Sequence, residues 1–328
     1  MTNYKIYLFV VLASIIVIGI GVLATRYLGE IGAARETLNS LNSEVIETDC
    51  GPIEYARVGD GYPLLVIHGA MGGFDQGLMI ADGNLDPGYQ VISVSRFGYL
   101  RSPRPENATL TMQADAYACL LDELRIEKAV VFATSGGANS GIRFTARYPE
   151  RVFALVLLSP AAPGPVVVAD PPLAVFNTLL RSEFVYWSMV TYFKRFMQCM
   201  VGVPDSLALT PELEGMVDNL LVKTMPVGGR VDGMISDFTL SPSEFYEETS
   251  DTAPYPLRNI ETPVLVLNAL DDPLAVPENV RGLAEKFPDA RLVVFPDGGH
   301  PILSHNQEVR AEIKQFLENT LAASNHSQ

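Results

Sequence analysis

Apolar and polar positions follow two alternating patterns along most of this chain. Short apolar runs such as PLLVIHG (residues 63–69) alternate with stretches whose apolar positions recur at helical spacing, such as TMQADAYACLLDELRI (111–126). A continuous apolar run predicts a strand that is covered on both faces, as in a parallel sheet. The repeated order of strand and helix therefore predicts an α/β fold, with a mostly parallel sheet and helices on both of its faces.

Each predicted strand is a short run rich in Val, Ile, Leu or Tyr that ends at a turn signal. Together with the turn residues that end them, these strands cover residues 44–48, 53–59, 63–69, 89–98, 128–135, 152–162, 263–272 and 290–300. The predicted helices cover residues 111–126, 138–149, 277–288 and 306–321. Thr111 is the expected N-cap of the first of these helices. Ligands of such sheets bind beyond the carboxyl ends of the strands, where His68, Ser135 and Asp272 fall.

The amino-terminal segment has a different pattern from the rest. It carries no charge from Ile6 to Ala24, which is long enough to cross a hydrocarbon core of about 30 Å and longer than a typical signal-peptide core. We expect residues 1–28 to be a retained membrane anchor and residues 29–43 to be a connector. A signal segment cleaved near Ala24 and a buried helix are the alternatives.

The charges that flank this segment leave its orientation open. Lys5 lies on one side of the uncharged run, and Arg26 and Arg35 lie on the other. A short, weakly positive leader in front of a large acidic domain favours export of that domain from the cytoplasm.

Residues 165–256 interrupt the alternation of strands and helices. They are dense in Phe, Tyr and Met, include Trp187, the only tryptophan, and have helical character. We expect a helical lid that faces the substrate, with ordinary core helices as the alternative. The core would then consist of residues 44–164 and 257–322, followed by a flexible tail from 323 to 328.

Composition and charge exclude several classes of protein. The 328-residue chain is 48% hydrophobic, so a folded domain is expected, and its net charge of -15 argues against a nucleic-acid partner. The three cysteines are widely spaced and form no CxxC motif, so we expect unpaired thiols rather than a disulfide framework. The sequence contains no GxGxxG, Walker A or HExxH motif, and no cofactor or metal is expected.

The stretch VVFATSGGANSG (residues 130–141) places one serine at a predicted strand-to-helix turn. A sharp turn around a nucleophilic serine needs small neighbours, and Ala133, Gly136 and Gly137 meet that need. Ser135 is therefore the candidate nucleophile, although a turn without chemistry is the alternative. Alanine replaces the usual first glycine of this turn, which is tolerable because the requirement there is close packing.

A serine nucleophile needs a histidine base and a carboxylate that orients it. His300 follows the last predicted strand on a glycine-rich loop, whereas His68 more naturally shapes a turn, His305 opens the last helix and His326 lies in the tail. The candidate acid is Asp272, with Asp271 as the alternative, because both follow the preceding strand. The resulting order along the chain is serine, aspartate, histidine.

From Glu44 to the last helix, the chain resembles a serine hydrolase of the α/β-hydrolase fold. The resemblance is carried by LLVIHGAMGG (64–73), SVSRFGYLRSPRP (93–105), ATSGGANSGIRFTARYPERVFALVLLSPAA (133–162) and residues 263–303, read together and in order. It implies an eight-stranded sheet with a lid inserted after the sixth strand. It also implies that Ser135 attacks a carbonyl carbon, that His300 is the base and that Asp272 orients His300.

The same resemblance implies an oxyanion hole made of two backbone N–H groups. One belongs to Gly136, and the other to Ala70, with Met71 as the alternative. A serine at the turn, rather than an aspartate, excludes the alkyl-enzyme chemistry of dehalogenases and epoxide hydrolases of this fold. We therefore expect a membrane-anchored hydrolase that cleaves a carboxylic ester of an apolar small molecule through an acyl-enzyme.

Two other functions remain open at this stage. One is hydrolysis of another acyl bond, in a lactone, an amide or the carbon–carbon bond of a diketone. The other is a non-catalytic receptor or scaffold with the same fold, which the presence of all three candidate catalytic residues disfavours.

Overall fold

The computed structural model describes residues 2–164, 180–239 and 256–325 of the chain. Its centre is an eight-stranded sheet of order β1-β2-β4-β3-β5-β6-β7-β8. The strands are β1 (Glu44–Ile46), β2 (Ile53–Val58), β3 (Tyr62–Ile67), β4 (Tyr89–Val94), β5 (Ala129–Thr134), β6 (Val152–Leu158), β7 (Val264–Ala269) and β8 (Ala290–Phe295). β1 pairs with β2, and β2 with β4, in antiparallel orientation, and every other neighbouring pair of strands is parallel. The predicted mostly parallel sheet is confirmed.

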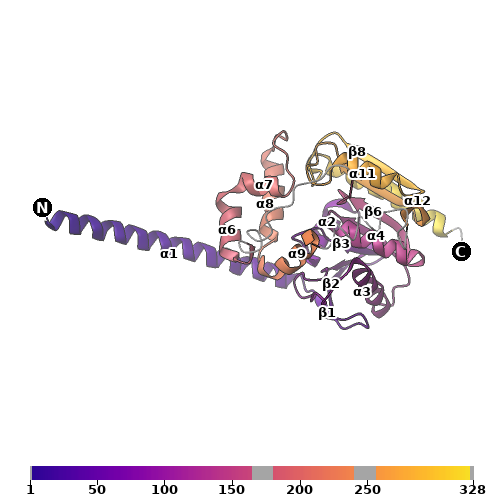
Figure 1. The fold of residues 1–328 in the computed structure, drawn as a ribbon, viewed down its shortest axis with the longest axis horizontal. Helices are drawn as coiled ribbons and strands as arrows, with labels where there is room; N and C mark the ends of the chain where they lie inside the picture. Colours follow the sequence, from indigo (N-terminus) through magenta and orange to yellow (C-terminus); the bar gives the residue numbers. More distant parts are fainter. Residues whose placement is uncertain (1, 165–179, 240–255, 326–328) are drawn as a thin grey trace.

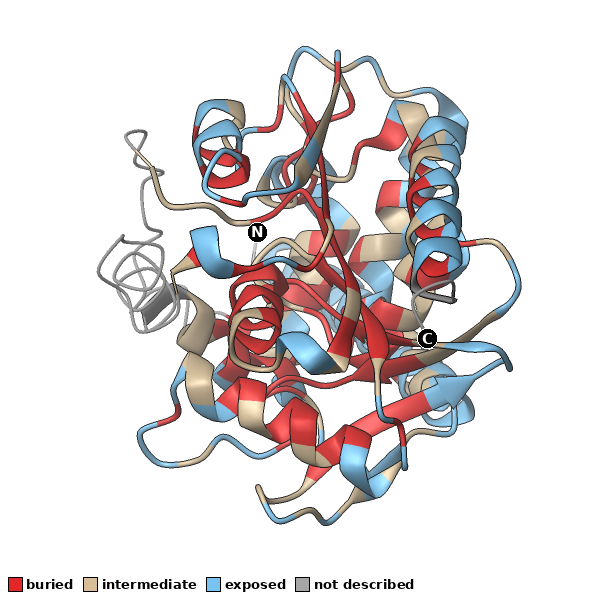
Figure 2. Ribbon diagram, turned by 90° about the vertical axis from the view of Figure 1, so that its right-hand side faces the viewer, coloured by how far each residue is buried: buried red, intermediate tan, exposed pale blue. Residues whose placement is uncertain are grey.

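Helices cover both faces of this sheet (Figure 1). One hydrophobic core joins the sheet to α3 (Leu110–Glu123), α4 (Gly137–Arg147) and α11 (Pro277–Ala284). A second core on the opposite face joins it to α2 (Phe74–Asn84) and α12 (Asn306–Asn325). Successive residues of a strand point to opposite faces, so Leu65 contributes to the first core and Val66 to the second. Buried residues accordingly concentrate in the sheet and on the inner sides of the helices (Figure 2).

Two local features differ from the sequence analysis. α3 begins at Leu110, and its N-cap is Thr109, whose side chain accepts a hydrogen bond from the Met112 N–H, so the assignment of the cap to Thr111 was wrong. α2 was not predicted because glycines weaken a helical pattern. A Cβ on Gly77 would lie 2.1 Å from the hydroxyl oxygen of Ser93 on β4, so the close packing of α2 on the sheet requires glycine there.

A single long helix, α1 (Thr2–Ser40), begins the chain and projects from the body (Figure 1). Among the described residues it is the one helix that is long and apolar enough to cross a membrane, and its apolar 18-residue stretch has a mean hydropathy of 2.9. The helix continues without a break through most of the region expected to be a connector. Ile31 is buried on it, and β1 begins four residues after the helix ends.

The described part of the segment between β6 and β7 is helical. It contains α6 (Glu183–Tyr192), α7 (Lys194–Met200), α8 (Pro211–Lys223) and α9 (Val231–Thr239). Single-turn 3-10 helices are η1 (Pro149–Arg151), η2 (Gly228–Arg230), η3 (Leu257–Asn259) and η4 (Leu303–His305). A third hydrophobic cluster centred on Trp187 joins α6, α8 and α9 to α1. The expected tail is helical up to Asn325, and residues 326–328 lie outside the described residues.

Cys50 and Cys119 form a disulfide that the sequence analysis did not expect. Cys50 follows β1, Cys119 lies on α3, and 69 residues separate the two in sequence. The expectation of three unpaired thiols was therefore wrong for this pair. Their spacing carried no signal because the fold alone brings the β1–β2 turn against α3. Cys199 is a free, exposed thiol.

Candidate active site

Ser135 occupies the sharp turn between β5 and α4. Its φ angle is +50°, in the left-handed region that non-glycine residues rarely adopt. The surrounding backbone holds this conformation: the Ser135 N–H donates to the Leu158 carbonyl at 3.0 Å, and the Ser135 carbonyl accepts from Ala138 and Ala161. Strain that is held by several contacts is typical of functional positions. The turn presents the serine side chain at the carboxyl end of the sheet.

Two glycines of α4 make this turn possible. A Cβ on Gly137 would lie 2.3 Å from the His68 carbonyl oxygen, so only glycine fits against the end of β3. A Cβ on Gly141 would lie 2.8 Å from the Cβ of Ala133. Space for alanine at position 133 is therefore provided by Gly141, one turn into the helix. Ala133 was expected to be tolerable at this turn, but its partner Gly141 was not predicted.

The structure brings the three candidate catalytic residues together from three different loops. His300 Nε2 lies 2.8 Å from Ser135 Oγ, and His300 Nδ1 lies 2.9 Å from Asp272 Oδ2. A carboxylate can only accept, so Nδ1 carries the proton and Nε2 presents its lone pair to the serine hydroxyl. The imidazole is thus placed to remove the hydroxyl proton.

The two candidate acids have different partners. The Asp272 side chain is fully buried, and its Oδ1 also accepts hydrogen bonds of 2.8 Å from the backbone N–H groups of Leu274 and Ala275. Asp271 instead accepts from the Gly299 N–H at 2.8 Å and so anchors the loop that carries His300. The geometry therefore places Asp272, and not Asp271, against the histidine ring.

The backbone of His300 is fixed on both sides. Its N–H donates to the Gly202 carbonyl at 2.9 Å, and its carbonyl accepts from the Ser159 hydroxyl at 2.7 Å. A Cβ on Gly202 would lie 2.3 Å from the Cβ of His300, so the chain just after α7 passes directly over the histidine. The segment inserted between β6 and β7 is in this way tied to the candidate base.

The backbone of Ala70 lies close to that of Gly136, the residue that follows the serine. An ideal Cβ on Gly136 would be 3.8 Å from the Ala70 nitrogen, and one on Gly69 would be 3.5 Å from Ser135 Oγ. The loop after β3 therefore runs alongside the serine. Met71, the alternative donor, has a φ of +62° and faces the third hydrophobic cluster.

His68 is fully buried below this loop and supports it. The Gly69 carbonyl, 2.7 Å from Nδ1, can only accept, and the Arg96 N–H, 3.0 Å from Nε2, can only donate. Burial, and then the charge of Arg96, hold the pKa of His68 well below its usual value. The ring is therefore neutral and shapes the turn, as predicted from its position.

A buried ion pair that was not predicted lies beside the loop after β3. We call this loop, residues 68–73, the oxyanion loop. Arg96, after β4, donates to both carboxylate oxygens of Asp237 on α9 at 2.6 Å, and it also donates to the Gly69 carbonyl at 3.0 Å. Burial, and then the Asp237 charge, raise the pKa of Tyr99, whose hydroxyl donates to Asp237 at 2.5 Å. An ideal Cβ on Gly136 would be 3.7 Å from Asp237 Oδ2, so this carboxylate borders the candidate oxyanion hole.

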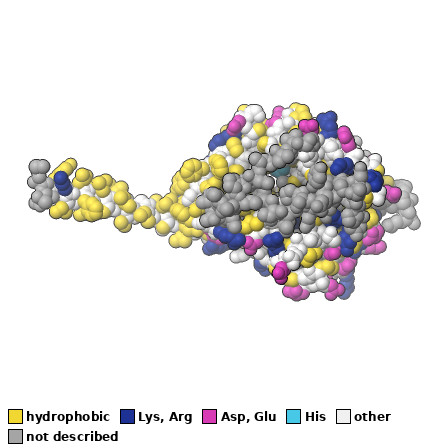
Figure 3. Space-filling view, viewed as in Figure 1, with side chains coloured by type: hydrophobic (Ala, Val, Ile, Leu, Met, Phe, Trp, Pro, Cys, Tyr) yellow, Lys and Arg dark blue, Asp and Glu magenta, His cyan; other side chains and the backbone are white. Residues whose placement is uncertain are grey.

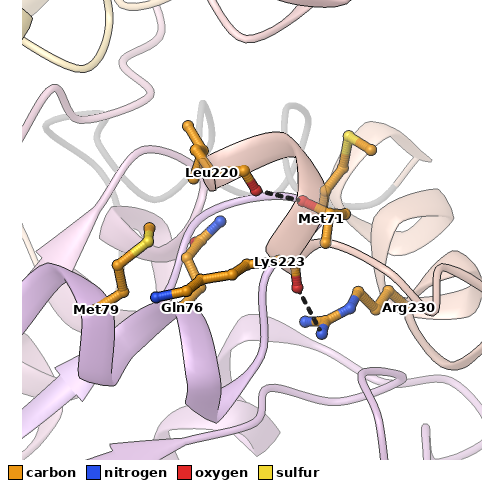
Figure 4. Close-up of a pocket in the computed structure, with 7 residues that line it drawn as sticks. Met71, Gln76, Met79, Leu220, Lys223 and Arg230 are labelled. Carbon is orange, nitrogen blue, oxygen red and sulfur yellow. Dashed lines mark hydrogen bonds between the residues drawn. The ribbon is translucent and has the colours of Figure 1, made fainter. Parts of the chain in front are cut away.

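A second buried ion pair holds the other end of the oxyanion loop. Arg230 donates to Asp75 at 2.7 and 2.9 Å and to the Gly72 carbonyl at 2.7 Å. Arg230 and Met71 lie on the wall of a small cavity between this loop and α8 (Figure 4). Ser135, Asp272 and His300 do not line this cavity, so it lies apart from the candidate catalytic residues.

The remaining histidines and possible metal ligands lie apart from this arrangement. His305 stacks on Phe295 and contacts Asp297 at 3.1 Å, and His326 lies outside the described residues. Within the described ranges, His, Cys, Asp and Glu side chains form no group of three that could hold a metal ion. The arrangement that is present, a serine in contact with a histidine whose other ring nitrogen faces an aspartate, is of a kind suited to acyl transfer.

Comparison with known proteins gives the same fold. A family model described as "alpha/beta hydrolase fold" matches residues 62–306. An uncharacterized hydrolase of Bacillus subtilis is 26% identical over 268 residues, which cover 79% of this chain and 92% of the relative. A solved alpha/beta hydrolase fold protein from Nakamurella multipartita is 26% identical, with a TM-score of 0.67, and the match covers 84% of this chain and 99% of that one.

A further relative has a named substrate. The 2-hydroxy-6-oxononadienedioate/2-hydroxy-6-oxononatrienedioate hydrolase of Cupriavidus pinatubonensis is 27% identical over 227 residues. The match covers 66% of this chain and 73% of that enzyme.

Proposed function

We propose, from the premise that this chain belongs to the alpha/beta hydrolase family, that it cleaves carboxylic esters through an acyl-enzyme on Ser135. The observation that carries the proposal is the contact of 2.8 Å between Ser135 Oγ and His300 Nε2, with Asp272 behind the ring. Three side chains from separate loops meet in the order that nucleophilic catalysis needs.

In this mechanism, Ser135 Oγ attacks the ester carbonyl carbon while His300 accepts the hydroxyl proton. The backbone N–H groups of Ala70 and Gly136 would stabilise the oxyanion of the tetrahedral intermediate. His300 then donates the proton to the leaving alcohol, and Asp272 stabilises the ring while it is charged. Water, activated by the same histidine, attacks the acyl-enzyme and releases the acid.

The charges beside the site favour a neutral substrate. The Cupriavidus relative is named as the hydrolase of a dioate, which is an anion with two carboxylates. In the present chain, Arg96 and Arg230, the two buried arginines at the oxyanion loop, are both paired with carboxylates. An ester without charged groups needs neither arginine, so we place ester hydrolysis ahead of carbon–carbon hydrolysis.

The insertion and the amino-terminal helix suggest where the substrate comes from. We propose that α6 to α9, between β6 and β7, form a lid over the site, because Gly202 packs on His300 and Asp237 borders the oxyanion hole. We also propose that α1 is a membrane anchor and that the body is exported. The Cys50–Cys119 disulfide supports export, since such bonds persist in oxidising compartments. An apolar ester dissolved in the bilayer fits both features.

The test of the nucleophile is covalent labelling with a fluorophosphonate probe. The unaltered chain should be labelled stoichiometrically and Ser135→Ala not at all. Ser188→Ala, which removes an exposed hydroxyl on α6, is the matched control and should label like the parent. Equal labelling of the parent and Ser135→Ala would rule out this nucleophile.

Substrate class is tested with p-nitrophenyl esters of increasing chain length, a lactone and a vinylogous diketone acid. We expect kcat/KM to rise with acyl chain length and to be lowest for the diketone acid. A higher kcat/KM for p-nitrophenyl acetate, or for the diketone acid, than for the longer esters would contradict the proposed substrate class.

A further inference from the structure

An exposed aromatic patch lies where α1 leaves the body. Tyr192 and Phe193 end α6, Phe196 follows on α7, and their exposed fractions are 53%, 61% and 53%. We call these three side chains the aromatic patch. Figure 3 shows apolar side chains continuing from the helix onto the adjoining flank of the body. Three large aromatic rings exposed together are unusual on an acidic, water-soluble surface and indicate a binding surface.

Contacts along α1 show where the aromatic patch lies along the helix axis, relative to the uncharged run from Ile6 to Ala24. Tyr192 lies next to Arg26, whose guanidinium carbon is 5.8 Å from the centre of the tyrosine ring. Arg26 comes two residues after Ala24, the end of the uncharged run. Leu23, which is still inside that run, packs against the same cluster as Trp187. The patch therefore begins where the apolar run ends.

The attachment of α6 to α1 is rigid. Glu30 accepts a hydrogen bond of 2.6 Å from the Trp187 indole N–H, and Arg35 pairs with Glu183 at 2.8 Å. The Tyr27 ring packs edge-on against Trp187 with centroids 5.4 Å apart. α1 has no linker between its apolar part and these contacts, so the patch cannot swing away from the end of the run.

The groups around the patch match the chemistry of a membrane interface. Lys194 and Arg195 stand between Phe193 and Phe196 in the chain, and Arg26 lies beside Tyr192. Aromatic rings with nearby long cationic side chains are typical of the headgroup region of bilayers, where the rings enter the acyl boundary and the charges remain at the phosphates. The pairing of these cations with Glu30, Asp218 and Asp205 keeps the net charge low.

From these observations we infer that the aromatic patch docks into the surface of the same bilayer that α1 crosses. This inference rests on the proposed anchor. The occupant is lipid, because the patch is continuous with the membrane-crossing segment and lies at the level of its end. α7 leads from Phe196 toward Gly202, which contacts His300, so the docked face is connected through this helix to the candidate base.

The experiment measures contact with lipid at single positions of the full-length chain in phosphatidylcholine vesicles. Cys199→Ser removes the free thiol, and a bimane dye is then attached at Phe193→Cys, Phe196→Cys, Ile15→Cys or Val58→Cys. Lipids with a nitroxide near the headgroup or deep in the acyl chain quench dyes that touch them. We expect loss of fluorescence with shallow nitroxide at positions 193 and 196 and with deep nitroxide at position 15. Val58 is an exposed apolar control on β2 and should keep its fluorescence.

The outcomes separate the docking from the anchor. Quenching at position 15 without quenching at 193 and 196 would overturn the docking and leave the anchor in place. Loss of quenching at all positions, including 15, would overturn the anchor and the docking with it. A third outcome is that the dyes at 193 and 196 are protected from nitroxide quenching by protein, and that this protection disappears when the protein is diluted in lipid. It would show that a second copy of the chain covers the patch, and it would also overturn the inference.

A functional readout accompanies the labelling. The double variant Phe193→Glu with Phe196→Glu should lose about tenfold in activity toward a long-chain ester carried in vesicles, because two rings no longer bury apolar area in the bilayer. Its activity toward water-soluble p-nitrophenyl acetate should be unchanged. Val58→Glu is the matched control and should change neither activity. An equal loss on both substrates would contradict an action through the membrane.

Discussion

Asp271 and Asp272 are neighbours in the sequence, yet only Asp272 contacts the imidazole of His300. Replacing Asp272 with asparagine keeps the shape but removes the charge and favours the wrong tautomer of the ring. We expect Asp272→Asn to lower kcat by about 10⁴, as for other orienting aspartates. The measurement is steady-state hydrolysis of the preferred p-nitrophenyl ester.

Asp271→Asn is a matched control for this change. It makes the same carboxylate-to-amide change at the neighbouring residue. Its amide oxygen can still accept from the Gly299 N–H, so kcat should fall less than about tenfold. Similar losses for the two variants would mean that the loop, and not the orientation of the ring, is what Asp272 supports.

Gly141 and Ala133 form a second pair that can be tested at the residue scale. Gly141→Ala places two methyl groups too close together and should lower the free energy of unfolding by about 1–3 kcal/mol. In an Ala133→Gly background the same change should be neutral or stabilising, because the clash is gone and alanine favours a helix. Urea denaturation measures all four chains of this cycle.

Gly83→Ala is the control for helix propensity. Gly83 lies on α2 with open space around its Cα, so alanine there should stabilise the fold by up to about 1 kcal/mol. If Gly141→Ala were equally harmless in the unaltered chain, the proposed packing between α4 and β5 would be wrong. The size argument for Ala133 was available from the sequence, but its partner on the next helix was not.

At the level of elements, α9 supplies the carboxylate that neutralises Arg96. Asp237→Asn would leave the guanidinium beside the proposed oxyanion hole without its counter-charge. We expect kcat/KM for an ester with a carboxylate on its acyl chain to rise about tenfold relative to the neutral ester, since a charged hydrogen bond contributes about 1.5–3 kcal/mol. The stability of the variant should fall by about 3 kcal/mol, because a buried charge loses its partner.

Asp232→Asn is the matched control, because it changes α9 at a residue that does not contact Arg96. Asp232 is exposed and pairs with Arg181, so its substitution should leave the ratio of the two kcat/KM values unchanged. A ratio that moves equally in both variants would point to a general effect of α9 and not to Arg96.

The elements that could be predicted are those with a local signal. The eight strands were predicted because each is a short apolar run between turn signals, and the catalytic candidates because each follows a strand. α2 gave a weak signal, since the glycine that lets it approach β4 also weakens its helical pattern. The pairing of Arg96 with Asp237 spans 141 residues, and that of Cys50 with Cys119 spans 69, so neither has a local pattern.

At the scale of the whole molecule, the side of the membrane can be tested with the free thiol. Cys199 is exposed, whereas Cys50 and Cys119 are bonded to each other. A membrane-impermeant maleimide should therefore label Cys199 on intact cells, because the body is proposed to lie outside the cytoplasm. Cys199→Ser should remove all labelling, and labelling that appears only after permeabilisation would place the body on the other side.

The continuity of α1 has a kinetic meaning for the whole molecule. With α1 as the proposed membrane anchor, a body carried on an unbroken helix, rather than on a loose tether, cannot turn over relative to the membrane. Its site then searches a plane at constant depth instead of a volume. For a lipid-soluble ester, the encounter rate is governed by lateral diffusion, and turnover follows the mole fraction of ester in the bilayer and not its concentration in the suspension.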